Sequence, residues 1–459
     1  MLNPLIAEEV LAAALQNGGD FAEIFLEDRQ NNLLLMRNDI IESVSSGRIH
    51  GAGIRVFHEL RCIYAYANDT TREGLLDCAA QVAAAIRNAP KGIDIHLTEQ
   101  KVDNRHIIRA YPASTPQTAR LAILRDANMA ARDTSPEIVQ AQARFMDSDQ
   151  RVWIANSEGL FTHDERVWTR MAVTAIASDG NENQTGSQSP GAMQGIELFE
   201  TVDAACAGRK AAETAVRMLH APDCPAGVMP VAMYGGFGGV VFHEACGHSL
   251  EATSVARGQS EFSGKLGQAI AAPCVTAIDD GTIPNAWGSL NIDDEGMPTN
   301  KLVLIENGIL KNYMIDKLNG LRMGMAPTGS GRRESYKYAP TSRMRNTYIA
   351  AGNDDEDEII SSMGDGLLAV SMGGGSVDPA TGVFNFSVAE GYLVKDGKID
   401  TPVRGASLIG RGSEVLIKID RVGKLVEHGQ GMCGAISGSV PTNVGQPTIR
   451  ISSLTVGGR

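Results

Sequence analysis

The segment Gly235–Glu251, GGFGGVVFHEACGHSLE, places two histidines and a glutamate on a stretch that we predict to be a helix entered from a glycine-rich turn. Neutral imidazoles are common metal ligands, and a glutamate beside one of them can take a proton from a water held at the metal. His243 and His248 are therefore candidate metal ligands, and Glu244 is the candidate general base. Because two histidines do not complete a metal site, the fold has to bring a further ligand to this segment.

The spacing of the two histidines requires a distorted helix. In the common zinc-binding pattern H-E-x-x-H, the histidines are four residues apart and lie on one helical face. Here they are five residues apart, which on a straight helix turns the second ring about 140° away from the first. A π-type bulge or an early end of the helix would bring the rings together. Gly247, directly before His248, permits such a distortion.

A catalytic zinc needs one more protein ligand and an open position for water. Four residues are candidates: Cys246, Cys274, His428 and Cys433. Cys246 follows His243 by three residues, which puts both on one helical face, but a small apolar cysteine facing the core is the simpler interpretation. Cys433 lies in the glycine-rich stretch GQGMCGAISGS, where glycines let the backbone approach a fixed point closely. The residues alone leave this choice open.

Composition and charge disfavour several classes of partner. The 459 residues, 43% hydrophobic and 21% charged, are those of a globular protein with two or three domains. The net charge of −13 disfavours binding to nucleic acid or to anionic lipid. We expect no membrane span, because the long uncharged run Cys224–Phe242 contains five glycines and two prolines.

The location of the protein is suggested by its start and by its cysteines. Glu8 and Glu9 stand where a secretory signal would carry basic residues, so no such signal is expected. The seven cysteines include no C-x-x-C pair, which favours a reducing cytoplasm over a disulfide framework.

Helix and strand patterns predict an α+β fold with αβ units followed by a β-rich domain. Residues 1–90 are expected to form an N-terminal αβ domain, and 91–117, which are irregular and contain prolines, a linker. Residues 118–222 are expected to form a central αβ unit that ends in the boundary sequence HAPDCPAG. Residues 223–459 are expected to form the β-rich C-terminal domain that carries the metal-binding helix.

Strand signals dominate this C-terminal domain. Lys301–Ile305 and Ile309–Ile315 flank Asn307-Gly308, and Asn-Gly is a strong hairpin signal. Val415–Ile419 is expected to be a further strand. The glycine run Met372–Gly375 is expected to be a turn rather than a surface on which a substrate strand lies.

A series of motifs between Pro230 and Gly458 resembles the TldD/PmbA family. In order they are VVFHEACGHSLE, SGKLGQAIAAPCVTAIDDGT, NIDDEGMPT, LIENGILKNYMIDKLN, PTGSGRRESY, and MCG followed by VPTNVGQPTIRISSLTVGG. The chain is more similar to the TldD branch, which keeps H-E-x-x-x-H, than to the PmbA (TldE) branch, which lacks it. Before Pro230 the resemblance is looser.

The resemblance implies a cytoplasmic zinc peptidase that acts on flexible peptides. It implies His243, His248 and Cys433 as ligands of Zn²⁺ and Glu244 as the general base. It also implies a PmbA/TldE-like partner subunit in a closed, tube-like heterodimer, with a homodimer as the alternative. The chain departs from the family at Cys246, where a small apolar residue is more usual, and the role of this cysteine stays open.

Two further questions stay open in the sequence. Arg332, Arg333 and Tyr336 in GRRESY are candidates, by residue type only, for stabilising an oxyanion, although ion pairing or packing is their commoner use. The alternative function is that of a non-catalytic partner or regulatory subunit, because PmbA-like proteins have this fold without the metal motif. A structural zinc protein would need a fourth ligand and would leave Glu244 without a task.

Overall fold

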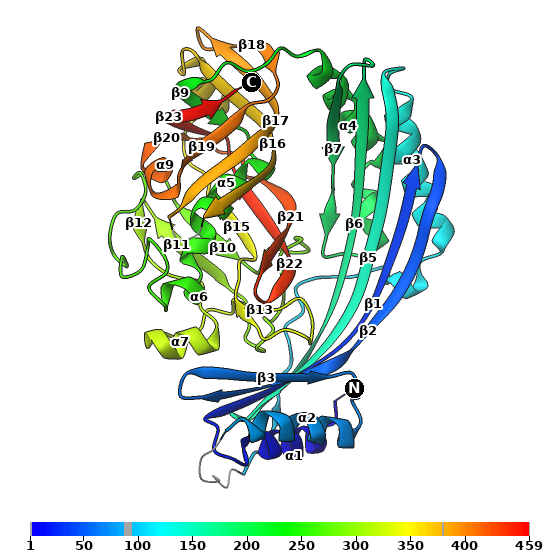
Figure 1. Ribbon diagram of the computed structural model, residues 1–459, viewed down its shortest axis with the longest axis vertical. Coiled ribbons are helices and arrows are strands. Elements are labelled where there is room, and N and C mark those ends of the chain that lie inside the picture. Colours follow the sequence, from blue (N-terminus) through cyan, green and yellow to red (C-terminus); the bar gives the residue numbers. More distant parts are fainter. Residues whose placement is uncertain (1, 87–93, 379–380, 459) are drawn as a thin grey trace.

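Long antiparallel strands from the first half of the chain form one bent sheet (Figure 1). The computed structural model describes residues 2–86, 94–378 and 381–458, so residues 91–93 of the expected linker lie outside it. The strand order is β3-β2-β1-β5-β6-β4, and β7 and β8 also pair with β6. The strands are β1 (Phe21–Arg37), β2 (Ile40–His58), β3 (Arg61–Ala67), β4 (Thr98–Glu99), β5 (Ile138–Asn156), β6 (Leu160–Ser178), β7 (Asn183–Gln188) and β8 (Gly191–Ala192).

The sheet joins the two N-terminal units of the sequence. Strand β1 pairs with β5 along its length, from Glu23 opposite Asn156 to Arg37 opposite Gln142. Strands from both sides of residues 91–117 therefore lie in a single hydrogen-bonded layer.

Four helices cover one face of this sheet. They are α1 (Pro4–Leu15), α2 (Arg72–Ala84), α3 (Gln117–Arg132) and α4 (Ala204–His220), and the 3-10 turns Pro112–Ser114 and Ile196–Glu200 precede α3 and α4. Asn3, Thr71 and Asp203 cap α1, α2 and α4, because each side chain accepts hydrogen bonds from the first turn. Side chains alternate along a strand, so the opposite face is left for the second half of the chain. No helix among the described residues is long and apolar enough to cross a membrane.

The second half of the chain is β-rich and is built around two sheets. One has the order β16-β9-β23-β19-β17-β18, and β16 also pairs with β17, which closes five of its strands into a ring. The other has the order β12-β11-β10-β15-β22-β21. The strands are β9 (Gly227–Met233), β10 (Ala277–Asp280), β11 (Lys301–Glu306), β12 (Ile309–Leu310), β13 (Gly331–Arg332), β14 (Thr341–Ser342), β15 (Asn346–Ile349), β16 (Gly366–Asp378), β17 (Val383–Lys395), β18 (Lys398–Val403), β19 (Ser407–Arg411), β20 (Ile419–Val422), β21 (Glu427–Ala435), β22 (Gly438–Gln446) and β23 (Ile449–Gly457).

Short helices connect these strands, and a single hydrophobic core lies between the two sheets. The helices are α6 (Ala252–Val255), α7 (Lys317–Met323), α8 (Glu356–Ser361) and α9 (Gly412–Lys418). The α+β architecture, with αβ units before a β-rich C-terminal part, is as predicted.

Two local predictions for the C-terminal part are wrong and one is confirmed. Val415–Ile419 lies mostly in α9, because Val415, Leu416 and Ile419 are buried at a helical spacing. Met372–Gly375 lies in strand β16, where the glycines take up irregularities in the pairing with β17 rather than reversing the chain. Asn307-Gly308 makes the predicted hairpin turn with φ of 48° and 81°, although the second strand is only Ile309–Leu310.

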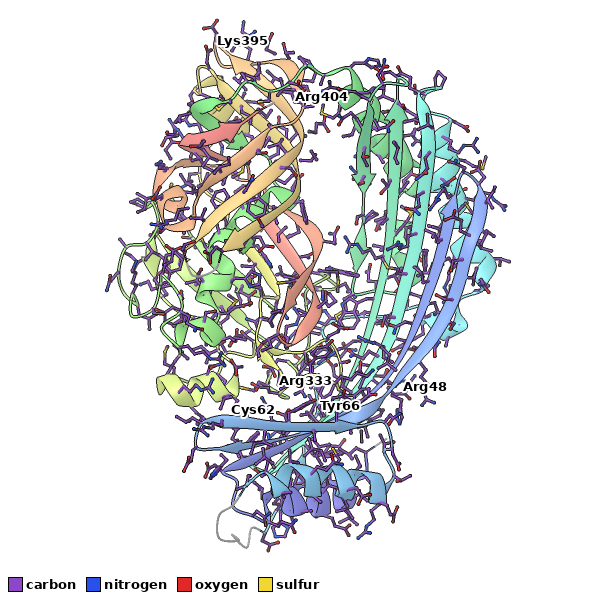
Figure 2. The ribbon with its side chains drawn as sticks, viewed as in Figure 1. Arg48, Cys62, Tyr66, Arg333, Lys395 and Arg404 are labelled. Carbon is purple, nitrogen blue, oxygen red and sulfur yellow. The ribbon has the colours of Figure 1, made fainter. Side chains whose placement is uncertain are left out.

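Buried ion pairs join the sheet to the C-terminal part. Glu23 on β1 accepts hydrogen bonds from Arg55 at 2.5 Å and from Arg333 at 2.6 Å, and all three side chains are buried. Arg55 also pairs with Glu295 at 2.9 Å. Arg333 lies where the C-terminal part meets the sheet (Figure 2). Removing one member would leave a buried charge without its partner, so the two halves are held together strongly.

Candidate metal centre

A glycine-rich turn brings the histidine segment against the hairpin of β21 and β22. After β9, the chain passes through the 3-10 turn η3 (Phe237–Gly239) and the short helix α5 (Val240–Phe242). Gly236 has a φ of +64°, which glycine adopts without strain. A Cβ atom on Gly239 would overlap the backbone of Gly445 on β22. Only a residue without a side chain therefore lets the segment lie so close to this strand.

The two histidines are joined by a π-helical turn. The turn η4 (His243–Gly247) is followed by the 3-10 turn η5 (His248–Leu250). The backbone N–H of His248 donates to the carbonyl of His243, five residues earlier. The imidazole rings lie 5.1 Å apart, nearly perpendicular. The predicted distortion is confirmed. Gly247 has helical φ and ψ of −54° and −52°, and its lack of a side chain leaves room for Met344 Sδ.

Of the four candidates for a third ligand, Cys433 on β21 is the one that reaches the histidines. Its Sγ lies 3.2 Å from His243 Nε2 and 3.3 Å from His248 Nε2. Cys246 is buried in the core, as the simpler interpretation predicted. Cys274 is exposed and donates to the carbonyl of Ile419, and the ring of His428 packs against Tyr348. Within residues 2–86, 94–378 and 381–458, His243, His248 and Cys433 form the one group of three with metal-ligand spacing.

These three donor atoms fit a zinc ion. All lie within 4.8 Å of one another. A tetrahedral zinc with Zn–N distances of about 2.0–2.1 Å and a Zn–S distance of about 2.3 Å holds its ligand atoms roughly 3.5 Å apart. Two imidazoles and one thiolate also leave a fourth position for water or substrate, as in zinc sites that catalyse.

The charges at the site favour a thiolate. Burial raises the pKa of the Cys433 thiol, but the charge of His243 and hydrogen bonds with both imidazoles outweigh burial and lower this pKa to about 3. Burial lowers the pKa of His248, but Glu251 and Cys433 outweigh it and raise this pKa well above its ordinary value. Burial raises the pKa of Cys246 well above its ordinary value. The thiolate is the form of cysteine that binds metal. The lowered pKa of Cys433 and the raised pKa of Cys246 therefore both favour Cys433 as the ligand.

Glu244 lies beside the three donor atoms and is more open to solvent than they are. Its side chain is 30% exposed, against 15% for that of His248. Its Oε2 atom is 3.7 Å from His248 Nε2, the nitrogen that faces Cys433. A carboxylate in this position can contact a water at the fourth position without being a ligand itself.

Two residues that the sequence analysis did not predict, Glu251 and Arg343, contact the residues that carry the donor atoms. Glu251 Oε2 lies 3.1 Å from His248 Nδ1, so a carboxylate fixes the orientation of this ring. Arg343 donates to the carbonyl of Cys433 and, at 2.8 Å, to that of Gly438. Glu251 could have been found in the sequence, because it follows His248 by three residues, a spacing that brings side chains together on a helix. Nothing near Arg343 in the sequence points to Cys433, 90 residues away.

Arg332, Arg333 and Tyr336 serve other contacts in the described structure. Arg332 donates to the carbonyl of Met344 at 2.6 Å, and Arg333 pairs with Glu23 on the sheet. Tyr336 packs in a cluster with residues of β1 and β5. The prediction that such residues commonly serve ion pairing or packing fits what they do here.

Comparison with known proteins identifies the family. Residues 226–458 match the PmbA/TldA metallopeptidase C-terminal domain, 110–219 the central domain and 22–89 domain 1. A metalloprotease TldD homolog from Haemophilus influenzae is 37% identical over 451 residues, which cover 96% of this chain and 93% of the relative. The chain belongs to the TldD/PmbA metallopeptidase family.

Further members of the family agree in sequence and in fold. A metalloprotease from Methanothermobacter thermautotrophicus is 32% identical over 96% of both chains. Crystal structures of a Thermotoga maritima protein and of TldE from Thermococcus kodakarensis superpose with TM-scores of 0.80 and 0.78, at 20% and 19% identity. Each covers 99% of this chain, and the alignments take in 99% and 100% of those structures. Both structures share the fold of the whole described chain.

Proposed function

We propose that this TldD/PmbA protein is a zinc-dependent peptidase that hydrolyses flexible or unfolded peptides. The observation that carries the proposal is that His243, His248 and Cys433 present three donor atoms within 4.8 Å of one another. The cysteine comes from a strand 185 residues beyond His248, and burying a polar cluster of this kind without a ligand would be costly. The names of the relatives, metalloproteases in bacteria and archaea, support the same class of reaction.

Each of these residues has its own proposed role in amide hydrolysis. His243, His248 and Cys433 would hold the zinc, which when bound lowers the pKa of water to about 7 and polarises a carbonyl group. Glu244 takes the proton of the attacking water and gives it to the leaving nitrogen. Glu251 holds His248 in the orientation that presents Nε2 to the site. Arg343 fixes the backbone of β21 at Cys433.

Substitution of the base tests this proposal. Glu244→Gln should keep its zinc and its fold but lose peptidase turnover by about 10²–10⁴-fold, because general base catalysis contributes that much. The measurement is hydrolysis of a peptide library by the purified wild type and variant, with metal content determined for both. Equal turnover would show that Glu244 is not the base. Wild-type protein that binds zinc and cleaves nothing would favour the non-catalytic subunit.

Substrate would reach the site as an extended strand. Trp287 donates to the carbonyl of Gly431 at 2.7 Å and Arg343 donates to that of Cys433, so side chains already occupy this part of the β21 edge. In the described structure, β16 beyond Ala369 pairs with β17 alone, which leaves its other edge open. Both β16 and β17 contact the π turn. An unstructured peptide can add to such an edge through main-chain hydrogen bonds, with little side-chain preference.

We further infer that the protein works in the cytoplasm with a second subunit. The partner would be a PmbA/TldE-like chain, or a second copy of this one, and would enclose the site. The similarity to TldE supports a fold shared by both partners. All seven cysteines lie in the described residues and are unpaired, which fits a reducing compartment.

The enclosure can be tested with one cleavable sequence in two forms. Offered as a free peptide it should be hydrolysed, and placed inside a stable folded domain it should resist, because a folded segment can neither enter nor add a strand. Rates are compared by mass spectrometry at equal concentrations. Similar rates for the two forms would rule out an enclosed site.

A further inference from the structure

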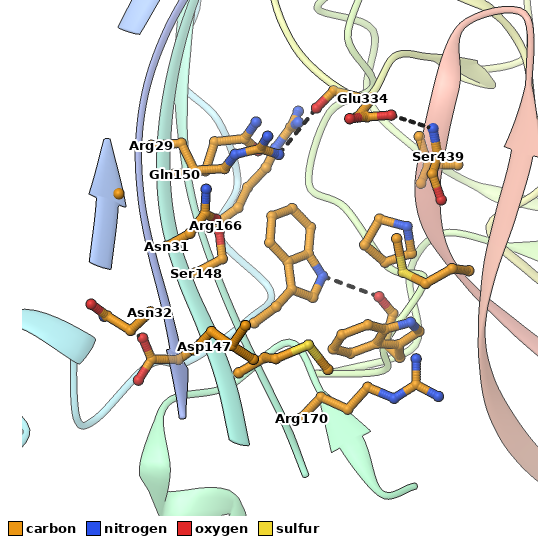
Figure 3. Close-up of a pocket in the computed structure, with 18 of the residues that line it drawn as sticks. Arg29, Asn31, Asn32, Asp147, Ser148, Gln150, Arg166, Arg170, Glu334 and Ser439 are labelled. Atoms are coloured by element: carbon orange, nitrogen blue, oxygen red, sulfur yellow. Dashed lines mark hydrogen bonds between the residues drawn. The ribbon is translucent and has the colours of Figure 1, made fainter. Parts of the chain in front are cut away.

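A cavity of about 600 Å³ lies between the N-terminal sheet and the β21–β22 hairpin (Figure 3). Arg29 and Ser148 lie on the sheet side of it, and Ser439 lies on the hairpin side. The cavity has the size of sites that hold a small molecule or a few amino-acid residues. None of the three donor atoms of the metal centre lines it.

The strand register builds the sheet side of the cavity as a regular array. Asn31 on β1 lies opposite Ser148 on β5, which lies opposite Trp168 on β6. In the next row, two residues on, Leu33 lies opposite Met146, which lies opposite Arg170. Residues two apart on a strand share a face, so all six side chains belong to the face away from α3 and α4. The wall is therefore part of the most regular section of the fold.

Positive charge is concentrated in this cavity. Its lining contains five arginines and three acidic residues, in a chain whose net charge is −13. Two of the arginines, Arg170 and Arg332, form no ion pair with a carboxylate among the described residues. Arg170 donates to Ser189 Oγ at 2.6 Å and to the carbonyl of Gln430 at 3.0 Å, which are neutral acceptors.

Arg332 is the more unusual of these two arginines. Its side chain is only 2% exposed, it lines the cavity from the C-terminal part, and it donates to the carbonyl of Met344. Burial lowers the pKa of Arg332 to about 10, and that of Arg170 also falls because of burial. Asp294, which also lines the cavity, and Asp279 offset only part of this effect. A buried guanidinium that pairs with no carboxylate directly is costly, and an anionic ligand would offset that cost.

Aromatic surface lies next to these charges. The indole of Trp168 donates to the carbonyl of Trp287 at 3.1 Å, and the guanidinium of Arg170 lies 5.4 Å from the centre of the Trp287 ring. Met432 and Pro441 add apolar surface from the hairpin. A ligand that fits this lining carries a carboxylate joined to an apolar group.

The cavity and the metal centre share the β21–β22 hairpin. Met432, which lines the cavity, directly precedes Cys433. Met432 and Cys433 are neighbours on β21, so the cavity lies against the strand that carries the thiolate. Trp287 and Arg170 also hydrogen-bond to the β21 carbonyls at Gly431 and Gln430. A group bound here would touch the strand that positions Cys433.

We propose that this cavity is a second peptide-binding site, which takes the C-terminal residue of a peptide. Arg170 binds the terminal carboxylate, and the positive charge of Arg332, on the opposite wall, also attracts it. The apolar side chain lies against Trp168 and Trp287. This role rests on the proposed peptidase function, and it would keep hold of a peptide chain beside the site where the chain is cut.

Binding without turnover tests the proposal. The full-length, zinc-loaded Glu244→Gln protein is titrated calorimetrically with N-acetyl-Ala-Ala-Ala-Leu as the free acid and as the C-terminal amide. Because hydrogen bonds to charged groups are the strong ones, the acid should bind about 10–100-fold more tightly than the amide. Two of the three tryptophans line the cavity, so the acid should also change the intrinsic fluorescence.

Variants assign the effect to the cavity. Arg170→Gln should reduce the affinity for the acid to that for the amide, and Arg170→Lys should retain part of the difference. Arg450→Gln, which alters a half-buried arginine that pairs with Asp420 and does not line the cavity, should bind as the parent does. Circular dichroism shows whether each variant is folded.

Three results would overturn the proposal. They are equal binding of acid and amide, an acid preference that survives in folded Arg170→Gln, and N-acetyl-leucine binding as tightly as the peptide. The last would assign the cavity to a small free carboxylate. None of these three binding results depends on hydrolysis. Failure of the peptidase proposal in the turnover assay of Glu244→Gln would therefore be a separate finding.

Discussion

The two histidines of the candidate metal centre are held in place by different means. His248 has the carboxylate of Glu251 behind it, 3.1 Å from Nδ1. His243 Nδ1 is buried with no hydrogen-bond partner among the described residues, so no side chain behind the ring helps Cys433 and packing to orient it. The outer carboxylate fixes both the tautomer and the angle of His248. A substitution at Glu251 should therefore disturb the site, although Glu251 is not itself a candidate ligand.

Glu251→Gln tests the importance of this carboxylate. The substitution keeps the shape of the side chain and removes its charge, and we expect zinc affinity to fall about 10–100-fold. Affinity is measured by competition with a chromogenic chelator. Glu306→Gln, at an exposed carboxylate, serves as the matched control. Unchanged affinity in Glu251→Gln would mean that His248 needs no outer partner.

Cys433 and Cys246, both buried, offer a second test at the scale of residues. Cys433→Ser should lose the single zinc expected per chain, because Sγ faces both histidines, as should His243→Ala and His248→Ala. Cys246→Ala should keep most of it, since Cys246 packs in the core. Zinc per folded chain is determined by atomic absorption. The opposite result, with metal lost from Cys246→Ala and kept in Cys433→Ser, would reverse the ligand assignment.

At the scale of elements, the site depends on how closely the histidine segment lies against β22. Gly239 packs against the Gly445 backbone, which cannot move aside as a flexible side chain can. Gly239→Ala should cost about 1–3 kcal/mol of stability, as overpacking does, and should lower the zinc content by displacing His243.

A glycine beside Cys433, the proposed metal ligand, provides the control for this variant. Nothing lies within 4 Å of a Cβ atom placed on Gly434, next to Cys433, so Gly434→Ala should change neither property. Stability is measured by urea unfolding of both variants. If the two variants behaved alike, the close approach at Gly239 would not matter for the site.

Elements also show how much of this molecule could be predicted from its sequence. The π turn follows from the five-residue spacing, since no straight helix brings His243 and His248 together. The choice of Cys433 does not follow from spacing, because it depends on a strand whose pairing is remote from the histidines; the family resemblance pointed to it. Val415–Ile419 was predicted as a strand because its helical burial pattern is too short to recognise without its neighbours.

At the scale of the whole molecule, buried charges link the N-terminal sheet to the C-terminal part. Arg55 on β2 pairs with Glu23 on β1, and its other terminal nitrogen lies 2.9 Å from Glu295 Oε1 in the C-terminal part. Burial raises the pKa of Glu295 to about 8 from its ordinary 4.5, against the opposing effect of Arg55. The folded state therefore holds a proton on Glu295 more tightly than the unfolded state does.

This difference predicts how stability depends on pH. The stabilisation from Glu295 is fully present below about pH 4.5, and it is lost as pH rises through about 8. Glu295→Gln cannot titrate, so its free energy of unfolding should fall less between pH 5 and pH 8.5 than that of the wild type. Urea unfolding at several pH values measures both slopes, and Glu158→Gln, at an exposed carboxylate, should keep the wild-type slope. Equal slopes for wild type and Glu295→Gln would place the titration elsewhere.

The distance along the chain between His243 and Cys433, 190 residues, has a consequence for the protein while it is being made. At about 5–20 residues per second, a ribosome needs roughly 10–40 s to pass from one to the other. Throughout that interval the growing chain carries both histidines and Glu244 but lacks the thiolate. A site completed by a late strand keeps the proposed peptidase inactive near other unfinished chains, which are unfolded and so are potential substrates. The order of synthesis thus delays hydrolysis until the β-rich half that surrounds the site has been made.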